Sequence, residues 1–396
     1  MDRGIRLYVS GQLALVTGSW SQNVGLNLLI YEQTGSATTL GLLNFLLFGP
    51  MLLVAPMAGA WIVPHKVKPI LLAALFANVV VSLVLAFVVA AGGFDTSALL
   101  ILAVLSGFSS AVEMPARLVL VSGSADRQDL VTNALGLNVL AVNVGRTVGS
   151  ALGAIVYGAF GAPATFLLFA AGLLAMAGCV TAMPMRRAPE GSYRAGLWRS
   201  VGYAIRQPFT AFFLPVVALI ALFASSYPTL VPLLSSAEFG DAAKYTGLFL
   251  TCGGVGAVLS SVVLSSRAGD AVGRRVVRLV PWVIGMTLGA ISLSPNLGST
   301  GLAFVVLGAG ITFTNAASSS VMLQHSPAEF RGSVAGLYSM AFAGFLPFGH
   351  LLAGWLTDFV GIRHAFAVMA LGLLATLGLV HAVHRYAFPD HRAGAS

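Results

Sequence analysis

The sequence predicts an all-α integral membrane protein in which twelve transmembrane helices form two pseudo-symmetric six-helix halves. Of its 396 residues, 57% are hydrophobic and only 9% are charged, which leaves too little polar surface to cover a soluble fold. About twelve apolar runs reach the roughly 20 residues that a helix needs to cross a bilayer. Identical residues also recur 200 positions apart without a gap: Gly136, Leu137, Ala141, Gly149, Gly161, Phe166, Gly172 and Leu173 match Gly336, Leu337, Ala341, Gly349, Gly361, Phe366, Gly372 and Leu373.

The predicted spans fill the chain almost from end to end. In the first half they cover Leu7–Tyr31, Leu40–Val63, Pro69–Ala90, Leu99–Leu120, Val131–Phe160 and Pro163–Met183. In the second half they cover Phe209–Leu233, Tyr245–Ser265, Val276–Leu293, Leu302–Leu323, Pro327–Leu356 and Ala365–Val383. Between the halves, Pro189-Glu190-Gly191-Ser192 interrupts the apolar pattern. We therefore expect a six-helix bundle at residues 1–185, a cytoplasmic linker at 186–208, and a second bundle with a short tail at 209–396.

The distribution of basic residues predicts the orientation of the bundle. Basic residues near helix ends stay on the cytoplasmic side of a membrane. The alternate loops that include both termini contain most of the basic residues, whereas the other set contains only Lys244 and Arg363. We expect both termini in the cytoplasm and the protein in the inner membrane of a bacterial cell. Because the formal net charge of +8 is dispersed over many short loops, nucleic-acid binding is not expected.

The sequence lacks catalytic and metal-binding signatures. It contains no phosphate loop, zinc-protease pair or nucleophile elbow. Cys179 and Cys252 fall in different predicted helices, without metal-ligand spacing. We therefore expect no enzyme activity, no cofactor and no metal site. Two similar membrane halves are typical of a transporter whose halves rock around a shared site. Without a nucleotide-binding loop, such transport would be driven by a gradient.

Short motifs recur along nearly the whole chain. The first half contains Thr34-Gly35-Ser36, Leu40-Gly41, Pro50, Pro56, Gly59, Pro115-Ala116-Arg117, Asn133-Ala134-Leu135, Gly145, Gly149 and Gly153. The second half contains Pro327, Arg331-Gly332, Pro347-Phe348-Gly349, Ala353-Gly354, Asp358 and Gly361. As a set these motifs resemble the major facilitator superfamily, and within it the branch of drug and siderophore exporters that includes enterobactin exporters. The resemblance implies a monomeric exporter of a small amphipathic molecule in exchange for protons, with the first, fourth, seventh and tenth helices around a central cavity.

Two positions depart from the family pattern. The loop after the second span lacks the usual acidic residue around Val63, and Gly149 is followed by Ser150 where the family has proline. The matching loop of the second half, which begins at Asp270, keeps its acidic and basic residues. From the resemblance we predict gating roles for Arg117, Asp270, Arg274, Arg275, Arg331 and Asp358.

Two residues are candidates for proton coupling. Glu113 is the one carboxylate predicted well inside a span, where a charge costs roughly 3 kcal/mol at the bilayer centre. We predict that it binds and releases the coupling proton, while Arg117, one turn away, is placed for an ion pair with it. His350, which the repeat equates with Ser150, is the second candidate because histidine titrates near neutral pH. The alternative for His350 is a neutral ring bonded to a backbone carbonyl.

Polar residues on the predicted cavity helices recur at three- and four-residue steps, which places each series on one helix face. Arg146 lies about midway along the fifth span, where its forked donors could hold an anionic or catecholate-like substrate. The alternative is that such residues only join helices to one another. We predict substrate contacts from Asn23, Asn27, Asn143, Arg146, Tyr227 and Asn315.

Two other substrate classes fit the sequence. A divalent metal exporter, for nickel or iron, would use His350 together with His381, His384 and His391, although a metal site needs two or more ligands at set distances. A lysophospholipid transporter would need a wide lateral opening between the halves. A non-transporting receptor or scaffold is a further alternative, and the polar stripes within the spans argue against it.

Overall fold

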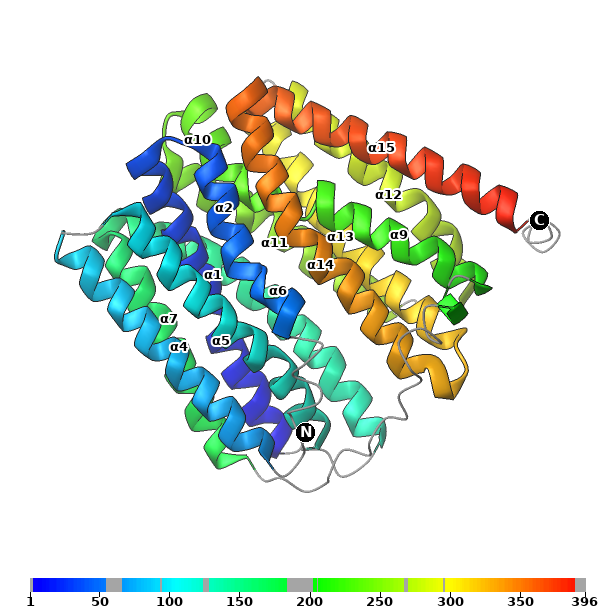
Figure 1. Cartoon of the computed structure of the whole chain (residues 1–396), viewed down its shortest axis with the longest axis horizontal. Helices are drawn as coiled ribbons and strands as arrows, with labels where there is room; N and C mark the ends of the chain where they lie inside the picture. Colours follow the sequence, from blue (N-terminus) through cyan, green and yellow to red (C-terminus); the bar gives the residue numbers. More distant parts are fainter. Residues whose placement is uncertain are drawn as a thin grey trace.

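The computed structural model describes residues 3–54, 66–92, 95–123, 128–183, 202–204, 206–266, 270–294 and 296–388, but not the side chains of residues 122–123, 128–135, 264–266, 270–277, 328–329 and 332. Within these ranges the regular secondary structure is entirely helical. Figure 1 shows the first half of the chain, from blue to green, at the lower left, and the second half, from green to red, at the upper right. The predicted fold class is therefore confirmed.

The helices of the first half follow the predicted spans. They are α1 (Arg3–Thr34), α2 (Ala37–Phe48), α4 (Val67–Ala90), α5 (Thr96–Gly123), α6 (Gln128–Phe160) and α7 (Ala162–Ala182). At the start of α2, the side chain of Ser36 accepts a hydrogen bond from the backbone N–H of Thr39, as an N-cap does. Helical backbone resumes after Gly49 and continues to Val54, and the rest of the second predicted span lies outside the described residues.

The second half repeats this arrangement with one interruption. Its helices are α9 (Pro208–Phe223), η2 (Tyr227–Thr229), α10 (Val231–Phe239), α11 (Ala242–Ser266), α12 (Asp270–Leu293), α13 (Leu297–Gln324), α14 (Ala328–Val360) and α15 (Ile362–Ala387). The sequence predicted one span at Phe209–Leu233, but the structure divides it into α9, η2 and α10. Pro228 and Pro232 lack the backbone N–H that a continuous helix would need at these positions. Each lies in the first two residues of a new helical segment, Pro228 in η2 and Pro232 in α10.

The internal repeat appears in the structure with its 200-residue offset. Helices α6 and α14 each have 33 residues and begin 200 positions apart. Each ends at a glycine with a positive φ, 77° at Gly161 and 83° at Gly361, and α7 and α15 follow directly. Because only glycine adopts this conformation without strain, the repeated glycines are needed for the turn between the helices of each pair.

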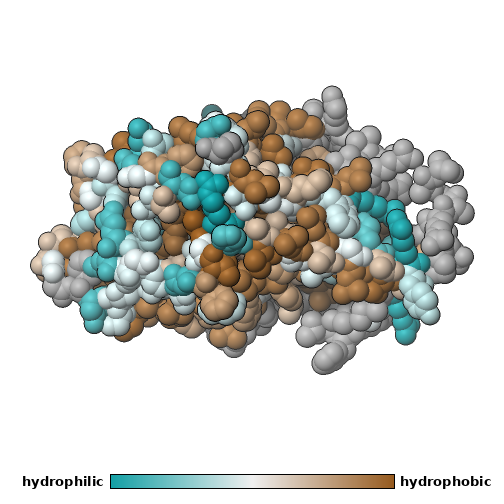
Figure 2. Space-filling view, turned by 90° about the horizontal axis from the view of Figure 1, so that it is seen from above, coloured by the Kyte–Doolittle hydropathy of each residue, from teal (hydrophilic) through white to brown (hydrophobic). Residues whose placement is uncertain are grey.

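The surface of the molecule is suited to lipid. Ten helices of the described chain are long and apolar enough to cross a membrane, and α1 and the shorter apolar stretch of α12 complete the twelve expected spans. Large apolar side chains such as Phe87, Phe160 and Phe359 are exposed on the outside. On the face shown in Figure 2, apolar residues cover most of the described surface and hydrophilic residues gather in separate groups. The chain is a multi-pass membrane protein.

Two pairs of helices join the halves. Helix α2 packs against α14, and α6 packs against α11. The helix backbones approach closely: a Cβ added at Gly354 would lie 2.2 Å from the carbonyl oxygen of Ala37, and one added at Gly254 would lie 2.2 Å from Oγ1 of Thr147. Small residues permit this spacing in membrane bundles. Arg146, Asn143, His350 and Asp358, described below, lie on helices of these two seams, whereas Glu113 lies inside the first half.

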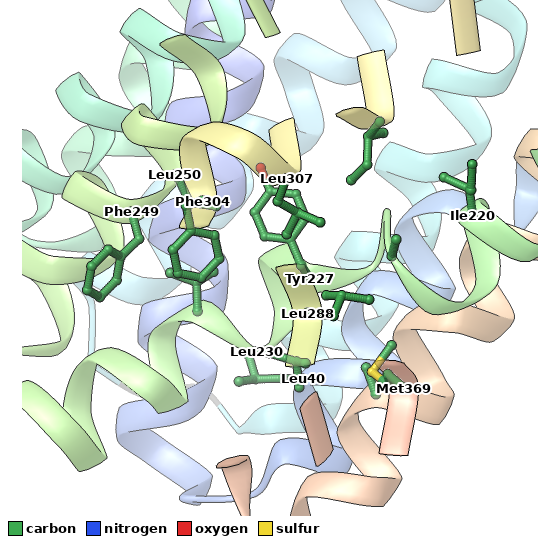
Figure 3. Close-up of a cluster of buried hydrophobic side chains, with 14 of the residues drawn as sticks. Leu40, Ile220, Tyr227, Leu230, Phe249, Leu250, Leu288, Phe304, Leu307 and Met369 are labelled. Carbon is green, nitrogen blue, oxygen red and sulfur yellow. The ribbon is translucent and has the colours of Figure 1, made fainter. Parts of the chain in front are cut away.

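The two ends of the bundle differ in their connections. We call one end the turn end, since it holds short connections, five of which contain a positive-φ glycine: Gly35, Gly92, Gly161, Gly240 and Gly361. We call the other end the terminal end, because the first helix begins there and the last one finishes there. The main apolar core spans both halves, and Figure 3 shows part of it, with Tyr227 among Leu288, Phe304 and Leu307.

Candidate functional site

Glu113 lies in the interior of the first half. Its side chain is only 4% exposed, and it is the only acidic residue among the described side chains that is buried. Nε of Arg117 lies 3.2 Å from Oε1 of Glu113, so the predicted ion pair is confirmed. Nη1 of Arg117 also donates to Oε1 of Gln12 at 2.7 Å. The pair therefore joins α5 to α1.

A polar residue of α4 completes the surroundings of Glu113. Asn78 interacts with the Glu113 carboxylate through its side chain. It also accepts a hydrogen bond from the Ser106 hydroxyl at 2.8 Å and donates one to Ser110 Oγ at 3.2 Å. Thus the polar stripe predicted on the fourth span faces α4 and α1. A proton arriving at Glu113 would weaken its attraction to Arg117 and change a network that spans three helices.

Arg146 has very different surroundings. Its guanidinium carbon lies 5.6 Å from the ring centroid of Trp20, a cation–π distance, and its Nε is buried without a hydrogen-bond partner. No ion pair or hydrogen bond involves its side chain within the described chain. The phenol of Tyr227 lies within electrostatic range of this guanidinium. Since Tyr227 belongs to η2, residues of both halves meet here.

Asn143 lies one turn from Arg146 and crosses the seam. Its Nδ2 donates to the Ser261 hydroxyl of α11 at 3.0 Å. Asn315, on α13, accepts a hydrogen bond from Tyr338 at its backbone oxygen, while its buried side-chain oxygen has no partner. Next to it, Ser319 and Tyr338 line a cavity of about 100 Å³ between α13 and α14.

Asn23 and Asn27 form a cluster with a residue that the sequence reasoning missed. Nδ2 of Asn44 donates to Oδ1 of Asn27 at 2.7 Å, and Oδ1 of Asn44 accepts from Asn23 at 3.3 Å. Asn27 also donates to the backbone oxygen of Asn23. The three amides join α1 to α2, and Asn23 is the most exposed of them. A single asparagine in the apolar run of α2 was the signal that could have revealed this partner.

His350 lies at the seam between α2 and α14. Its Nδ1 is 2.7 Å from the Thr229 hydroxyl, and its ring stacks on Phe48 with 5.4 Å between centroids. The partner is a side-chain hydroxyl, so the predicted alternative of a backbone carbonyl is wrong. His350 therefore connects the broken seventh span to the seam between the halves.

Asp358 joins the halves at the turn end. Its carboxylate accepts hydrogen bonds from the Ser36 hydroxyl at 2.9 Å, the backbone N–H of Ala37 at 2.9 Å and that of Thr38 at 2.8 Å. A negative charge at the N-terminus of a helix is also favoured by the helix dipole. We call Asp358, Ser36, Ala37 and Thr38 the turn-end latch. It connects the end of α14 to the start of α2.

The remaining gating candidates lie away from this latch. Arg331 is exposed near the start of α14, and its Nε donates to the backbone oxygen of Ser326. The side chains of Asp270, Arg274 and Arg275 lie outside the described residues, as does Val63 in the second-span loop. Their predicted roles stay predictions.

The histidines of the metal-exporter alternative do not come together. Within the described ranges, no three His, Cys, Asp or Glu side chains form a group that could hold a metal. Nδ1 of His381 bonds the backbone oxygen of Leu377, and Nε2 of His384 bonds that of Pro208. His391 lies outside the described residues. No group of ligands in the described chain supports a metal substrate.

Comparison with known proteins agrees with this architecture. A model of the family described as transmembrane secretion effector matches residues 6–394. The chain is also similar to the Staphyloferrin A transporter of Staphylococcus aureus (strain NCTC 8325 / PS 47), with 22% identity over 388 residues and 96% of each protein covered.

Solved transporters have the same fold. The nucleoside transporter NupG superposes with a TM-score of 0.74 at 13% identity, over 98% of this chain and 100% of its own. A bacterial homologue of the human lysosomal transporter Spinster, in an inward-facing and unoccupied conformation, superposes with a TM-score of 0.72 at 12% identity, over 98% and 97% of the two chains.

Proposed function

This chain belongs to the transmembrane secretion effector family of major facilitator transporters, and we propose that it exports an amphipathic small molecule in exchange for protons. We propose a siderophore or a hydrophobic drug as the substrate, moved by alternating access between the two halves. The family description supports the outward direction, and the similarity to a staphyloferrin transporter supports the substrate class.

The buried carboxylate of Glu113 is the observation that carries this proposal. A carboxylate inside a membrane protein is costly and generally marks a functional site. Glu113 is held by Arg117 and Asn78, and through Arg117 it reaches Gln12 on α1. Protonation would release Arg117 from Glu113, and because Arg117 also bonds Gln12 of α1, a proton could change how α5 packs on α1. We propose Glu113 as the proton carrier.

The latch supplies a gate for the same cycle. We propose that the terminal end faces the cytoplasm of a bacterial cell, since the basic loops lie at that end. The turn-end latch would then close the pathway on the outside. The described hydrogen bonds between the halves lie at the latch and at Asn143–Ser261, near the middle of α6. This arrangement supports a state that is open toward the cytoplasm.

Transport in proteoliposomes with an imposed pH gradient tests the role of Glu113. The full-length protein would be assayed with a panel of siderophores and hydrophobic dyes. We expect Glu113→Gln to lose gradient-driven transport but to keep substrate exchange without a gradient, because the binding region remains intact. The matched control is Asp95→Asn, which removes an exposed carboxylate that caps α5. Full gradient-driven transport by Glu113→Gln would contradict proton coupling at this residue.

A further inference from the structure

We infer, building on the proposed function, that the transported molecule is an organic anion whose carboxylate binds Arg146 between the two halves. This assigns a chemical class to the substrate and makes an uncharged or cationic drug the wrong one.

The geometry of α6 directs Arg146 to the space between the halves. One face of α6 contacts α1: Cβ atoms added at Gly145 and Gly149 would lie within 3 Å of Val16 and Thr17. Another face contacts α11 through Asn143 and Thr147. At 100° per residue, Arg146 lies on the strip between these two faces. The guanidinium lies near the ring of Trp20 on α1, and it interacts electrostatically with the phenol of Tyr227 in the second half.

Arg146 lacks a counter-ion in the described structure. Arginine stays protonated in proteins, so this region holds a permanent positive charge. Arg117 and Arg363 are each paired with a glutamate, but Arg146 has only the face of Trp20. A cation–π contact offsets only part of the free energy that removing a guanidinium from water costs. An anion entering this region would compensate that charge.

The chemistry of the surroundings narrows the class of anion. A guanidinium presents two parallel N–H donors that match a carboxylate. Buried hydroxyls of Ser150, one turn along α6, and Ser225, two residues before Tyr227, have no hydrogen-bond partner. Trp20 offers aromatic surface beside the charge, and the phenol of Tyr227 lies within electrostatic range of it. These groups suit a small organic acid that combines a carboxylate with a flat apolar part.

A matched pair of probes separates charge from shape. The thermal stability of the full-length protein in detergent would be measured with salicylate and with salicylamide, which differ chiefly in the carboxylate, and with citrate. A ligand of the folded state raises the melting temperature. We expect salicylate to raise it most, citrate, which has carboxylates but no flat apolar part, to raise it less, and salicylamide not to raise it. We expect Arg146→Gln to remove the effect, and Arg146→Lys and Tyr227→Phe to reduce it.

The control is Lys244→Gln, which also removes one positive charge but at the turn end, where Lys244 lies over the ring of Tyr245. It should respond to salicylate as the natural protein does. Calorimetric titration of each variant with salicylate keeps the test valid if Arg146→Gln is itself less stable. Equal stabilisation by salicylamide, unchanged salicylate binding by Arg146→Gln, or no response of the natural protein to either anion would overturn the inference. Gradient-driven transport of an uncharged dye that depends on Glu113 would overturn it while leaving the proposed function intact.

Discussion

At the scale of single residues, two partly buried arginines of the first half show two ways in which a membrane protein can hold a charge. Arg117 is held by Glu113 and Gln12, so it is compensated within its own bundle. Arg146 faces the other half with only an aromatic ring beside it. Removal of one member of a buried pair leaves an uncompensated charge. The paired arginine therefore suits a role in coupling, and the unpaired one a role in binding.

Gly256 provides a direct test of packing between α11 and α13. A Cβ at this position would lie 1.9 Å from the backbone oxygen of Val305, which cannot move without shifting α13. We expect Gly256→Ala to destabilise the protein by about 1–3 kcal/mol, as overpacked cores do. The melting temperature in detergent measures this effect. The matched control is Gly178→Ala in α7, where a Cβ meets open space and which should change stability by no more than about 1 kcal/mol.

Glu238 at the turn end should make stability depend on pH. Hydrogen bonds from the Arg363 side chain, at 2.6 and 2.8 Å, hold the pKa of Glu238 below its usual value of 4.5. The stabilisation is therefore present above about pH 4.5 and is lost as the pH falls through the lowered folded-state value. Because the pair is partly exposed, we expect it to contribute less than about 1 kcal/mol.

Comparison of Glu238→Gln with the natural protein measures this contribution. At neutral pH the variant should melt at a lower temperature, and below the folded-state pKa of Glu238 the two proteins should melt together. A difference that does not shrink as the pH falls below 4.5, where the carboxylate of the unfolded chain becomes protonated, would show that the pair is not the cause.

Some site residues could be predicted from sequence and others could not, for a physical reason. The Glu113–Arg117 pair follows from spacing along one helix, and the structure confirms it. Gln12, Asn44 and Asn78, in contrast, became visible only as partners from other helices. Periodicity reports which face of a helix is polar, but not which neighbouring helix that face meets.

At the scale of helices, the latch shows why a helix terminus is useful as a gate. The first N–H groups of α2 have no partner within their own helix, and Asp358 of α14 supplies one. The sequence predicted where α2 begins to within a few residues but not that a residue 320 positions away would cap it. Similarly, the sequence predicted one continuous seventh span although it contains Pro228 and Pro232, and the break at η2 came only from the structure.

We expect Asp358→Asn to weaken the closure of the turn end. The asparagine amide keeps one acceptor oxygen but loses the negative charge. Its NH₂ group is a donor and cannot bond the backbone N–H group that the second carboxylate oxygen accepts from. A loss of about 1–2 kcal/mol would shift the ratio of closed to open states roughly tenfold. Distances between spin labels placed on α2 and α14 at the turn end would report the shift.

Asp95→Asn is the matched control for this measurement. Asp95 also accepts a hydrogen bond from the start of a helix at the turn end, but it caps α5 within its own half. Its loss should leave the distance distribution unchanged. If both variants shifted it equally, general weakening of caps, and not release of the latch, would explain the result.

At the scale of the whole molecule, the internal repeat and the two seams suit a transporter whose two halves move relative to each other. Corresponding helices of the halves, such as α6 and α14, have equal lengths, while the seams join α2 to α14 and α6 to α11. The first half therefore contributes α2 and α6 to the seams, and the second half contributes α14 and α11. Rocking about these seams would open one end as the other closes. The latch lies at the turn end, where the halves would separate, and Arg146 lies about midway between the two ends.

Cross-linking of the latch tests the movement itself. In a protein whose Cys179 and Cys252 are replaced by alanine, Ser36→Cys with Asp358→Cys should form a disulfide, because the native side chains lie 2.9 Å apart. The oxidised protein should stop transporting, since its turn end cannot open, and reduction should restore transport. Neither single cysteine variant can form this cross-link, so the transport rate of each should be insensitive to oxidation. If the cross-linked protein transported at the rate of its reduced form, the halves would not need to part at the turn end, and alternating access about these seams would be wrong.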